Sequence, residues 1–419
     1  MNILILCNKS PWPPKEGGPI AMNMIIEGLI SAGHQVKVVA VNSYKYNIHP
    51  DEIPDEYRKK TRIELIDVDL RINPWKAFLN LFSGRSYHVE RFISSSFRKR
   101  LIEILKQESF DIVQFETLYV SPYLDTIRNY SGAPIVLRAH NIEHLIWSRV
   151  AESTANPVKR WYIRHLAKTL KNYEHSVINR VDGIAAITEN DAEYFRHRSS
   201  VIRHPSSVIR HPSSVIRHPS SVRIVSIPFG IDLKKYPAPA ESTGLFSLCT
   251  IGAMNWIPNA EGVKWFLHHV WPDLHKEFPE LRYYLAGREM PEWMLRMEFP
   301  GVVVLGEVED AREFISGKGI IIVPLFSGSG IRIKIIEGMA AGKPIISTRI
   351  GAEGIDCTNG KNILIANAPC EFVELVTLCL HDEIRCRNLG KEARVLVETT
   401  YDQAEIIRKL IHFYQQLSG

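Results

Sequence analysis

The sequence has only six cysteines in 419 residues, scattered without a CxxC pair or a histidine at metal-ligand spacing. This argues against a disulfide framework and a metal site, and it predicts reduced thiols in a cytoplasmic protein. The sequence also lacks the unbroken apolar run that a membrane-spanning helix needs. The opening residues MNILILC are too short for the core of a signal peptide, so we expect a first β-strand there.

A strong excess of charge of either sign is also absent. The net charge of +5 is modest for this length and gives no reason to expect a nucleic-acid partner. Lysine and arginine are nevertheless concentrated in two predicted helices, 98–107 and 157–180. These helices either rest peripherally on acidic lipid headgroups at the inner face of a membrane or present an ordinary solvated surface.

The length and the alternation of elements predict two α/β domains. A chain of this size exceeds one hydrophobic core. Short apolar segments alternate with helical stretches, which is typical of doubly wound parallel sheets that bind ligands at the carboxyl ends of their strands. We expect a first domain over 1–235, a Pro-rich linker at 234–244 and a second domain over 245–400. A last helix within 402–419 is predicted to pack back on the first domain.

Four tandem heptads related to RHPSSVI occupy residues 196–223. A coiled coil is excluded because proline recurs every seven residues and would break each helix. The repeat is also too short and too few for a solenoid. We interpret it as an expanded surface loop, tolerated because the entropic cost of closing a loop grows slowly with its length.

The stretch 323–354, VPLFSGSGIRIKIIEGMAAGKPIISTRIGAEG, predicts an anion site. A buried strand ends at Pro324, a Ser/Gly loop follows, and a helix is predicted from Ile331 until Gly342 ends it. The unpaired N–H groups and the dipole at the start of such a helix attract phosphate.

Three charged residues of this predicted helix sharpen the interpretation. Arg332 and Lys334 lie where cations oppose the helix dipole, so a phosphate or diphosphate ligand would compensate for them. Glu337, one turn later, can accept hydrogen bonds from the hydroxyls of a ribose. The alternative is a solvated basic face with a Lys334–Glu337 ion pair.

Two further candidates lie in the first domain. Gly17 and Gly18, at a loop-to-helix junction, would let a phosphate approach the backbone closely, although a plain turn explains them equally well. His140 leaves a predicted strand at 133–141, at the edge where such sheets bind ligands. A histidine there is either functional or an ordinary loop start.

The block GSGIRIKIIEGMAAGKPIIST resembles the donor-binding signature of glycosyltransferase family 4. Further matches follow the family's order: a Gly-Gly loop, HNIEH, IPFGID, GAMNWIPN, LAGR and LGEVED. The resemblance implies the GT-B fold, two Rossmann-like doubly wound domains facing a cleft. It also implies retaining transfer of a sugar from a nucleotide sugar to a saccharide or lipid-linked acceptor, in polysaccharide or glycoconjugate biosynthesis, without a metal or cofactor.

The resemblance assigns roles to residues of the second domain. Glu337 matches the glutamate that binds the ribose hydroxyls, and the backbone N–H groups of Gly330 and Ile331 would face the donor phosphates. Val308 matches the position that lines the nucleobase slot, with Arg288 nearby.

In the first domain, Gly17 and Gly18 match the loop near the donor diphosphate, and His140 matches the active-site histidine near the transferred sugar. The sequence departs from the family at Ser329, where a glutamate usually contacts that sugar. The usual Arg and Lys after the first strand of the second domain are also missing. We therefore expect Arg332 and Lys334 to supply the charge that stabilises the departing diphosphate.

Other functions stay open at this point. The chain could bind a nucleotide sugar without catalysis, which the serine at 329 favours. A GT-B epimerase or phosphorylase would need acid/base carboxylates or a cofactor lysine, and neither pattern is evident. A dinucleotide-dependent dehydrogenase would need GxGxxG after the first strand, where CNKSPWPPKEGG stands instead.

Overall fold

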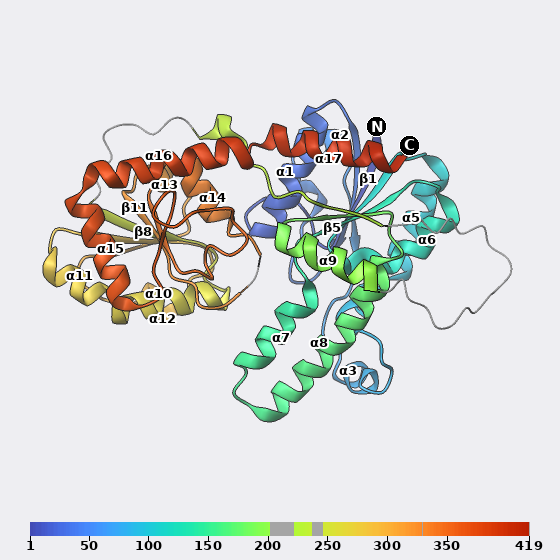
Figure 1. Cartoon of the computed structure of the whole chain (residues 1–419). Helices are drawn as coiled ribbons and strands as arrows, with labels where there is room; N and C mark the ends of the chain where they lie inside the picture. The colour runs from blue at the N-terminus through green and yellow to red at the C-terminus, as the bar shows by residue number, and fades with distance from the viewer. Residues whose placement is uncertain (202–221, 237–245, 329, 419) are drawn as a thin grey trace. The chain divides into compact units, whose positions relative to one another are not determined.

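The structure is a computed structural model that describes residues 1–201, 222–236, 246–328 and 330–418 (Figure 1). The chain forms two compact units. The first comprises Met1–Phe229 and Ile406–Gly419, and the second comprises Gly230–Glu405. Most of the last helix therefore belongs to the first unit, although the chain passes through the second unit before reaching it.

The first unit is built on a seven-stranded parallel sheet in the order β3-β2-β1-β4-β5-β6-β7. Its strands are β1 (Asn2–Cys7), β2 (Gln35–Asn42), β3 (Glu64–Asp67), β4 (Ile112–Glu116), β5 (Ile135–Ala139), β6 (Gly183–Ala186) and β7 (Arg223–Ser226). The direction of winding reverses between β1 and β4. The carboxyl ends of these two strands therefore border the crevice in which doubly wound sheets bind ligands.

Helices cover both faces of this sheet because its central strands are apolar on both sides. Leu4 and Leu6 of β1 belong to one buried cluster, while Ile3 and Ile5 face a second cluster that includes side chains of the last helix. The helices are α1 (Gly17–Ser31), α2 (Asp55–Thr61), α3 (Pro74–Asn80), α4 (Tyr87–Glu90), α5 (Ser95–Gln107), α6 (Leu124–Tyr130), α7 (Glu143–Ser153), α8 (Pro157–Ile178), α9 (Glu189–Val201) and α17 (Gln403–Ser418), with 3₁₀ turns η1 (Pro50–Glu52) and η2 (Leu118–Tyr123).

The second unit is built on a six-stranded parallel sheet in the order β10-β9-β8-β11-β12-β13. Its strands are β8 (Ser247–Ile251), β9 (Arg282–Ala286), β10 (Val302–Gly306), β11 (Ile320–Val323), β12 (Ile345–Ser347) and β13 (Leu364–Ile365). Its helices are α10 (Ile257–His269), α11 (Trp271–Glu277), α12 (Glu292–Leu295), α13 (Ala311–Ser316), α14 (Ile333–Ala340), α15 (Pro369–His381) and α16 (Glu383–Thr400), after the 3₁₀ turn η3 (Leu233–Lys235). Here the winding reverses between β8 and β11.

Three local predictions were wrong. The irregular sequence pattern of 44–110 indicates helices and loops that cover the sheet, but the region also contains β3, which adds an edge strand beside β2. The first copy of the heptad repeat is helical, because α9 continues to Val201 while its preceding turns bury Ala192 and Phe195. The rest of the repeat, 202–221, lies outside the described residues. Helix α14 begins at Ile333 rather than Ile331, since Arg332 has extended backbone angles and forms the N-cap.

No helix in the described part of the chain combines the length and the apolar character needed to cross a lipid bilayer.

Candidate functional site

In the second unit, the loops that follow β8 and β11 meet at the point where the winding reverses. The loop after β11 needs glycine twice, because Gly328 (φ 108°) and Gly330 (φ 80°) adopt left-handed backbone angles. A Cβ atom on Gly328 would also lie only 2.8 Å from the ring of Trp256, which comes from the loop after β8. The two glycines therefore allow the left-handed backbone of this loop, and Gly328 also allows its close packing against Trp256. Ser329 lies outside the described residues.

Arg332 closes this loop at the N-terminus of α14. Its side chain is 6% exposed, and its guanidinium donates a hydrogen bond back to the carbonyl of Gly330. The guanidinium carbon lies 5.2 Å from the centre of the Trp256 ring, a cation–π distance. These contacts hold a positive charge at the helix end where the dipole already favours an anion.

Lys334 brings a second cation to the same place. Its Nζ donates to Oδ1 of Asn259 at 2.7 Å, and a Cβ on Gly252 would lie 3.3 Å from this nitrogen. Burial, followed by the charge of Arg332, lowers the pKa of Lys334 to about 7. An amine with this pKa is only partly protonated at neutral pH, and it becomes fully protonated when an anion binds beside it.

Glu337, one turn further along α14, contacts Tyr236 rather than Lys334. The Tyr236 hydroxyl donates to Oε1 of Glu337 at 2.9 Å. Burial raises the pKa of Glu337, while the Tyr236 hydrogen bond and the nearby Arg312 act in the opposite direction. The alternative Lys334–Glu337 ion pair is therefore replaced by two separate polar contacts. A partly buried carboxylate of this kind is suited to accept hydrogen bonds from sugar hydroxyls.

Arg288 and Val308 lie on neighbouring loops of the second unit. Arg288 follows β9, and its Nε lies 3.2 Å from Oε1 of Glu307, which follows β10. Val308 is the next residue and is half-buried. Both predicted nucleobase residues therefore belong to loops at the carboxyl ends of adjacent strands. Ile331, whose backbone was predicted to face phosphates, lies between the Ser/Gly loop and α14.

In the first unit, the Gly-Gly pair forms the first turn of α1. The N-cap, Glu16, makes no side-chain capping bond, and its carboxylate instead pairs with Lys9 Nζ at 3.2 Å. A Cβ on Gly18 would lie 3.1 Å from the Lys9 side chain, whereas one on Gly17 would meet open space. The junction thus combines uncapped helical N–H groups, which attract anions, with a lysine that is paired with Glu16.

His140 follows β5 and contacts a buried carboxylate on the neighbouring strand. Its Nε2 lies 2.5 Å from Oε2 of Glu116, the last residue of β4, which is fully buried. The ring of Phe229 meets the imidazole edge to face, with centroids 5.5 Å apart. His140 is therefore held in one orientation at the carboxyl edge of the sheet.

The Glu116 carboxylate is itself held by a buried chain of hydrogen bonds. Gln114 Nε2 donates to Glu116 Oε1 at 2.5 Å, and the Tyr414 hydroxyl of α17 donates to Gln114 Oε1. Burial, then the charge of Glu116, raises the pKa of Tyr414, so this phenol stays protonated and remains a donor. The C-terminal helix thus contributes directly to fixing His140.

The remaining charged residues of the HNIEH motif anchor α7. Glu143 accepts a hydrogen bond from the Tyr119 hydroxyl at 2.9 Å, and His144 Nδ1 lies 2.5 Å from Glu174 on α8. Burial and the neighbouring Glu174 raise the pKa of Glu143 to about 7. All these groups except Tyr119 are less than 9% exposed, so they anchor α7 to α8 and to the 3₁₀ turn η2 inside the unit.

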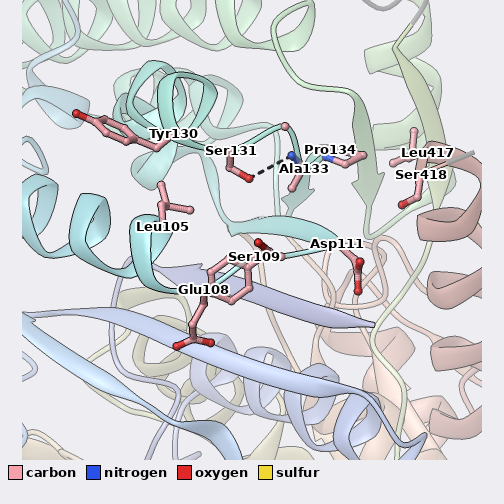
Figure 2. A pocket seen from close by; sticks show the side chains of 12 residues that line it. Leu105, Glu108, Ser109, Asp111, Tyr130, Ser131, Ala133, Pro134, Leu417 and Ser418 are labelled. Atoms are coloured by element: carbon pink, nitrogen blue, oxygen red, sulfur yellow. Dashed lines mark hydrogen bonds between the residues drawn. The ribbon is translucent and has the colours of Figure 1, made fainter.

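A pocket of about 510 Å³ in the first unit lies at the opposite edge of the sheet (Figure 2). Its lining includes Asp111, which directly precedes β4, and Pro134, which directly precedes β5. Glu116 and His140 lie at the other ends of these two strands. Because doubly wound sheets bind ligands at the carboxyl ends, this pocket is not the predicted site.

Four polar residues of these arrangements were not predicted from the sequence: Lys9, Glu116, Tyr236 and Asn259. Glu116 had a usable signal, because it ends the apolar segment FDIVQFE (110–116), and His140 likewise lies at the end of the predicted strand 133–141. Tyr236 was assigned to the linker, and Asn259 was noted only as the last residue of the motif GAMNWIPN. Neither pattern indicates a partner on α14.

Within the described ranges, no group of three or more His, Cys, Asp or Glu side chains is arranged to hold a metal ion. The positive charge that could meet a phosphate comes instead from Lys9 in the first unit and from Arg332 and Lys334 in the second.

Each unit matches a family model. The model described as Glycosyltransferase Family 4 matches residues 17–212, and the model described as Glycosyl transferases group 1 matches residues 246–382. A protein of Klebsiella pneumoniae, described as an uncharacterized 44.6 kDa protein in the cps region, is 21% identical over 419 residues. The alignment covers 97% of this chain and 98% of that protein.

Solved structures resemble the whole chain. Sucrose-phosphate synthase from Thermosynechococcus elongatus is similar with a TM-score of 0.67 and 14% identity, covering 100% of this chain and 99% of that one. Anabaena Alr3699/HepE, in complex with UDP-glucose, has a TM-score of 0.66 and 12% identity, covering 99% and 100%. The predicted fold, two doubly wound α/β domains of the GT-B type, is confirmed.

Proposed function

The chain belongs to the group 1 glycosyltransferases, and we propose that it transfers a sugar from a nucleoside-diphosphate sugar to a hydroxyl of a saccharide or lipid-linked acceptor, with retention of configuration. The nucleotide sugar as donor is supported by similar structures that were solved with UDP and UDP-glucose. The relative in the cps region supports a role in surface polysaccharide or glycoconjugate biosynthesis.

The single observation that carries the proposal is the setting of Lys334. It lies in the first turn of α14, beside Arg332 and at the reversal point of the sheet, with a pKa lowered to about 7. Negative charge builds up on the diphosphate as the sugar departs. Cations and helical N–H groups fixed in advance stabilise that charge without reorganising. We assign this task to Arg332, Lys334 and the amides of Gly330 and Ile331.

The rest of the donor is assigned to the neighbouring loops. Glu337 binds the ribose hydroxyls, and Val308 and Arg288 border the nucleobase. In the first unit, Gly17 and Gly18 approach the diphosphate, and His140, oriented by Glu116, lies near the transferred sugar. No metal or cofactor is part of this proposal, so we expect activity to persist in the presence of EDTA.

Proton NMR of the reaction products tests the proposal. The purified protein is incubated with a panel of nucleotide sugars and saccharide acceptors, and the anomeric coupling of the new linkage is compared with that of the donor. Retention is the expected result. A product with the opposite anomeric configuration would contradict the retaining mechanism, whereas loss of transfer in EDTA would contradict only the metal-independent part.

A further inference from the structure

Helix α3 in the first unit carries its apolar face outward. Trp75, Phe78, Leu79 and Phe82 follow the i, i+3, i+4, i+7 spacing of one helical face, and they are 77%, 54%, 65% and 79% exposed. The face continues past the end of the helix because the Phe82 N–H still bonds to the Leu79 carbonyl. A helix of a globular domain normally buries such a face against the core, so this orientation needs an explanation.

The orientation of α3 is fixed by polar contacts on its other side. Asn80 is only 4% exposed, and its Nδ2 donates to Oε2 of Glu90 at 2.7 Å. At the start of the helix, the backbone N–H and carbonyl of Asn73 both bond to the Tyr87 hydroxyl, at 3.0 and 3.2 Å. Because α4 holds both ends of α3, the apolar face stays turned toward solvent.

The charges around this face have a small positive excess. Residues 70–89 contain Arg71, Lys76 and Arg85 but no aspartate or glutamate. Arg71 pairs with Asp69 and Arg85 pairs with the half-buried Glu90, just outside this segment, so residues 69–90 carry a net charge of +1. Aromatic residues on one face with lysine and arginine at its border are typical of helices that lie in the interface of an anionic membrane.

The hairpin of α7 and α8 extends the same region. Helix α4 joins it to α3, since the His88 ring packs against Trp147 of α7 in a tilted arrangement, with centroids 4.0 Å apart. The outer end of α8 exposes Val158 and Trp161, at 73% and 60%. Figure 1 shows α7 and α8 projecting from the sheet, with α3 at the same end of the unit.

The two basic helices noted in the sequence, α5 and α8, differ in what their basic residues contact. Helix α8 exposes Val158 and Trp161 near its start and also presents Lys159 and Arg164 to solvent. Helix α5, in contrast, uses Arg100 to pair with Glu64 and Glu103 within the unit. Only α8 combines basic residues with exposed aromatic ones.

We propose that the apolar face of α3, defined as Trp75, Phe78, Leu79 and Phe82, inserts into the interface of an anionic phospholipid bilayer, with α8 contacting the headgroups. The proposal rests on the proposed function for its purpose, because it would bring the enzyme to a lipid-linked acceptor. The binding itself needs neither donor nor catalysis.

Vesicle co-sedimentation tests the proposal on the full chain. Vesicles of pure phosphatidylcholine are compared with vesicles containing about 30% phosphatidylglycerol, whose surface potential attracts basic segments. We expect the wild type to sediment with the anionic vesicles and less at high salt. The variant Trp75→Ser/Phe78→Ser/Phe82→Ser should bind at least about tenfold more weakly, because interfacial binding scales with buried apolar area.

The matched control is Trp293→Ser/Leu295→Ser, which removes two exposed apolar side chains from α12 of the second unit. It should bind vesicles as the wild type does. The proposal is overturned if the wild type does not bind anionic vesicles, or if the triple variant binds as well as the wild type. It is also overturned if light scattering shows a wild-type oligomer that the triple variant converts to monomer, because the face would then join two copies.

Nucleotide binding separates this proposal from the proposed function. The triple variant should keep the thermal shift that a nucleoside diphosphate produces in the wild type, which also shows that it folds. The variant Lys334→Ala should lose that shift but still sediment with vesicles. If the triple variant and Lys334→Ala each lose both the thermal shift and vesicle binding, the membrane proposal is wrong.

Discussion

Glu116 Oε2 lies 2.5 Å from His140 Nε2, so a fully buried carboxylate on β4 orients the histidine that follows β5. This contact leads to the first prediction. Glu116→Gln should lower kcat by about 10²-fold, because a neutral amide no longer orients the His140 imidazole as the carboxylate does. This is the lower end of the range for losing a positioned acid–base group. The affinity for a nucleoside diphosphate, measured by calorimetry, should stay unchanged.

The same unit offers a matched control for this prediction. His144 and Glu174 form a second buried pair at 2.5 Å that anchors α7 to α8. Glu174→Gln should lower the thermal unfolding midpoint while leaving kcat nearly unaltered. If the two variants lose kcat and stability in the same proportion, the Glu116–His140 contact has only a structural role.

Lys334→Met should abolish nucleotide binding and yet stabilise the ligand-free protein by about 1 kcal/mol, as expected where a functional site holds an unfavourable charge. The pKa of Lys334 is lowered from 10.5 to about 7 in the fold, so the unfolded chain binds this proton more tightly. The stabilisation should therefore be largest below pH 7 and shrink as the pH rises toward 10.5. Thermal unfolding at several pH values measures it. A lower unfolding midpoint at pH 6.5 would contradict this reading.

Nucleotide affinity should depend on pH through the same amine. The diphosphate binds the protonated form, so the dissociation constant should rise by up to about tenfold per pH unit above pH 7, until the pKa of the bound state is reached. Calorimetry in buffers of different ionisation enthalpy should detect proton uptake on binding. Lys334→Arg provides the comparison, because arginine remains charged throughout and should remove this dependence.

Glu337→Ala should weaken binding of a nucleoside diphosphate by roughly tenfold to hundredfold, the value of hydrogen bonds to a charged group. A 2′,3′-dideoxy analogue lacks the hydroxyls that Glu337 is proposed to bind, so the wild type and the variant should bind it equally. A double-mutant cycle that combines Glu337→Ala with the dideoxy analogue isolates the interaction energy between Glu337 and the ribose hydroxyls. Tyr236→Phe, which removes the other partner of this carboxylate, should preserve the preference for the ribose. If Glu337→Ala weakens binding of the dideoxy analogue as much as binding of the ribonucleotide, Glu337 does not bind the ribose hydroxyls.

The fold was largely predictable because its central strands and helices have strong local patterns. The apolar strand 2–7, the Gly-Gly junction and the strand–loop–helix at 323–354 were all recognised. Strand β3 was not, because ELID lies at the sheet edge and is only half-buried, so its composition gives little contrast with the surrounding loops. The start of α14 was misplaced by two residues, because the glycines at 328 and 330 prolong the loop before the helix.

The candidate site was less predictable, because its polar contacts join residues far apart in the chain. Tyr236 and Glu337 are separated by 101 positions, and Tyr414 and Gln114 by 300. The sequence shows that Lys334 opposes the helix dipole, but its contact with Asn259 depends on how two loops of the second sheet meet. The outward face of α3 was missed for a different reason, since helical spacing alone does not reveal which side faces the core.

Release of nucleoside diphosphate from nucleotide sugars, in the presence of saccharide acceptors, tests the central claim most directly. The wild type should release the diphosphate with at least one donor of the panel, and Lys334→Ala, at an equal or higher unfolding midpoint, should release none above background. Full activity in the Lys334→Ala variant would contradict the assignment of the α14 N-terminus as the donor diphosphate site.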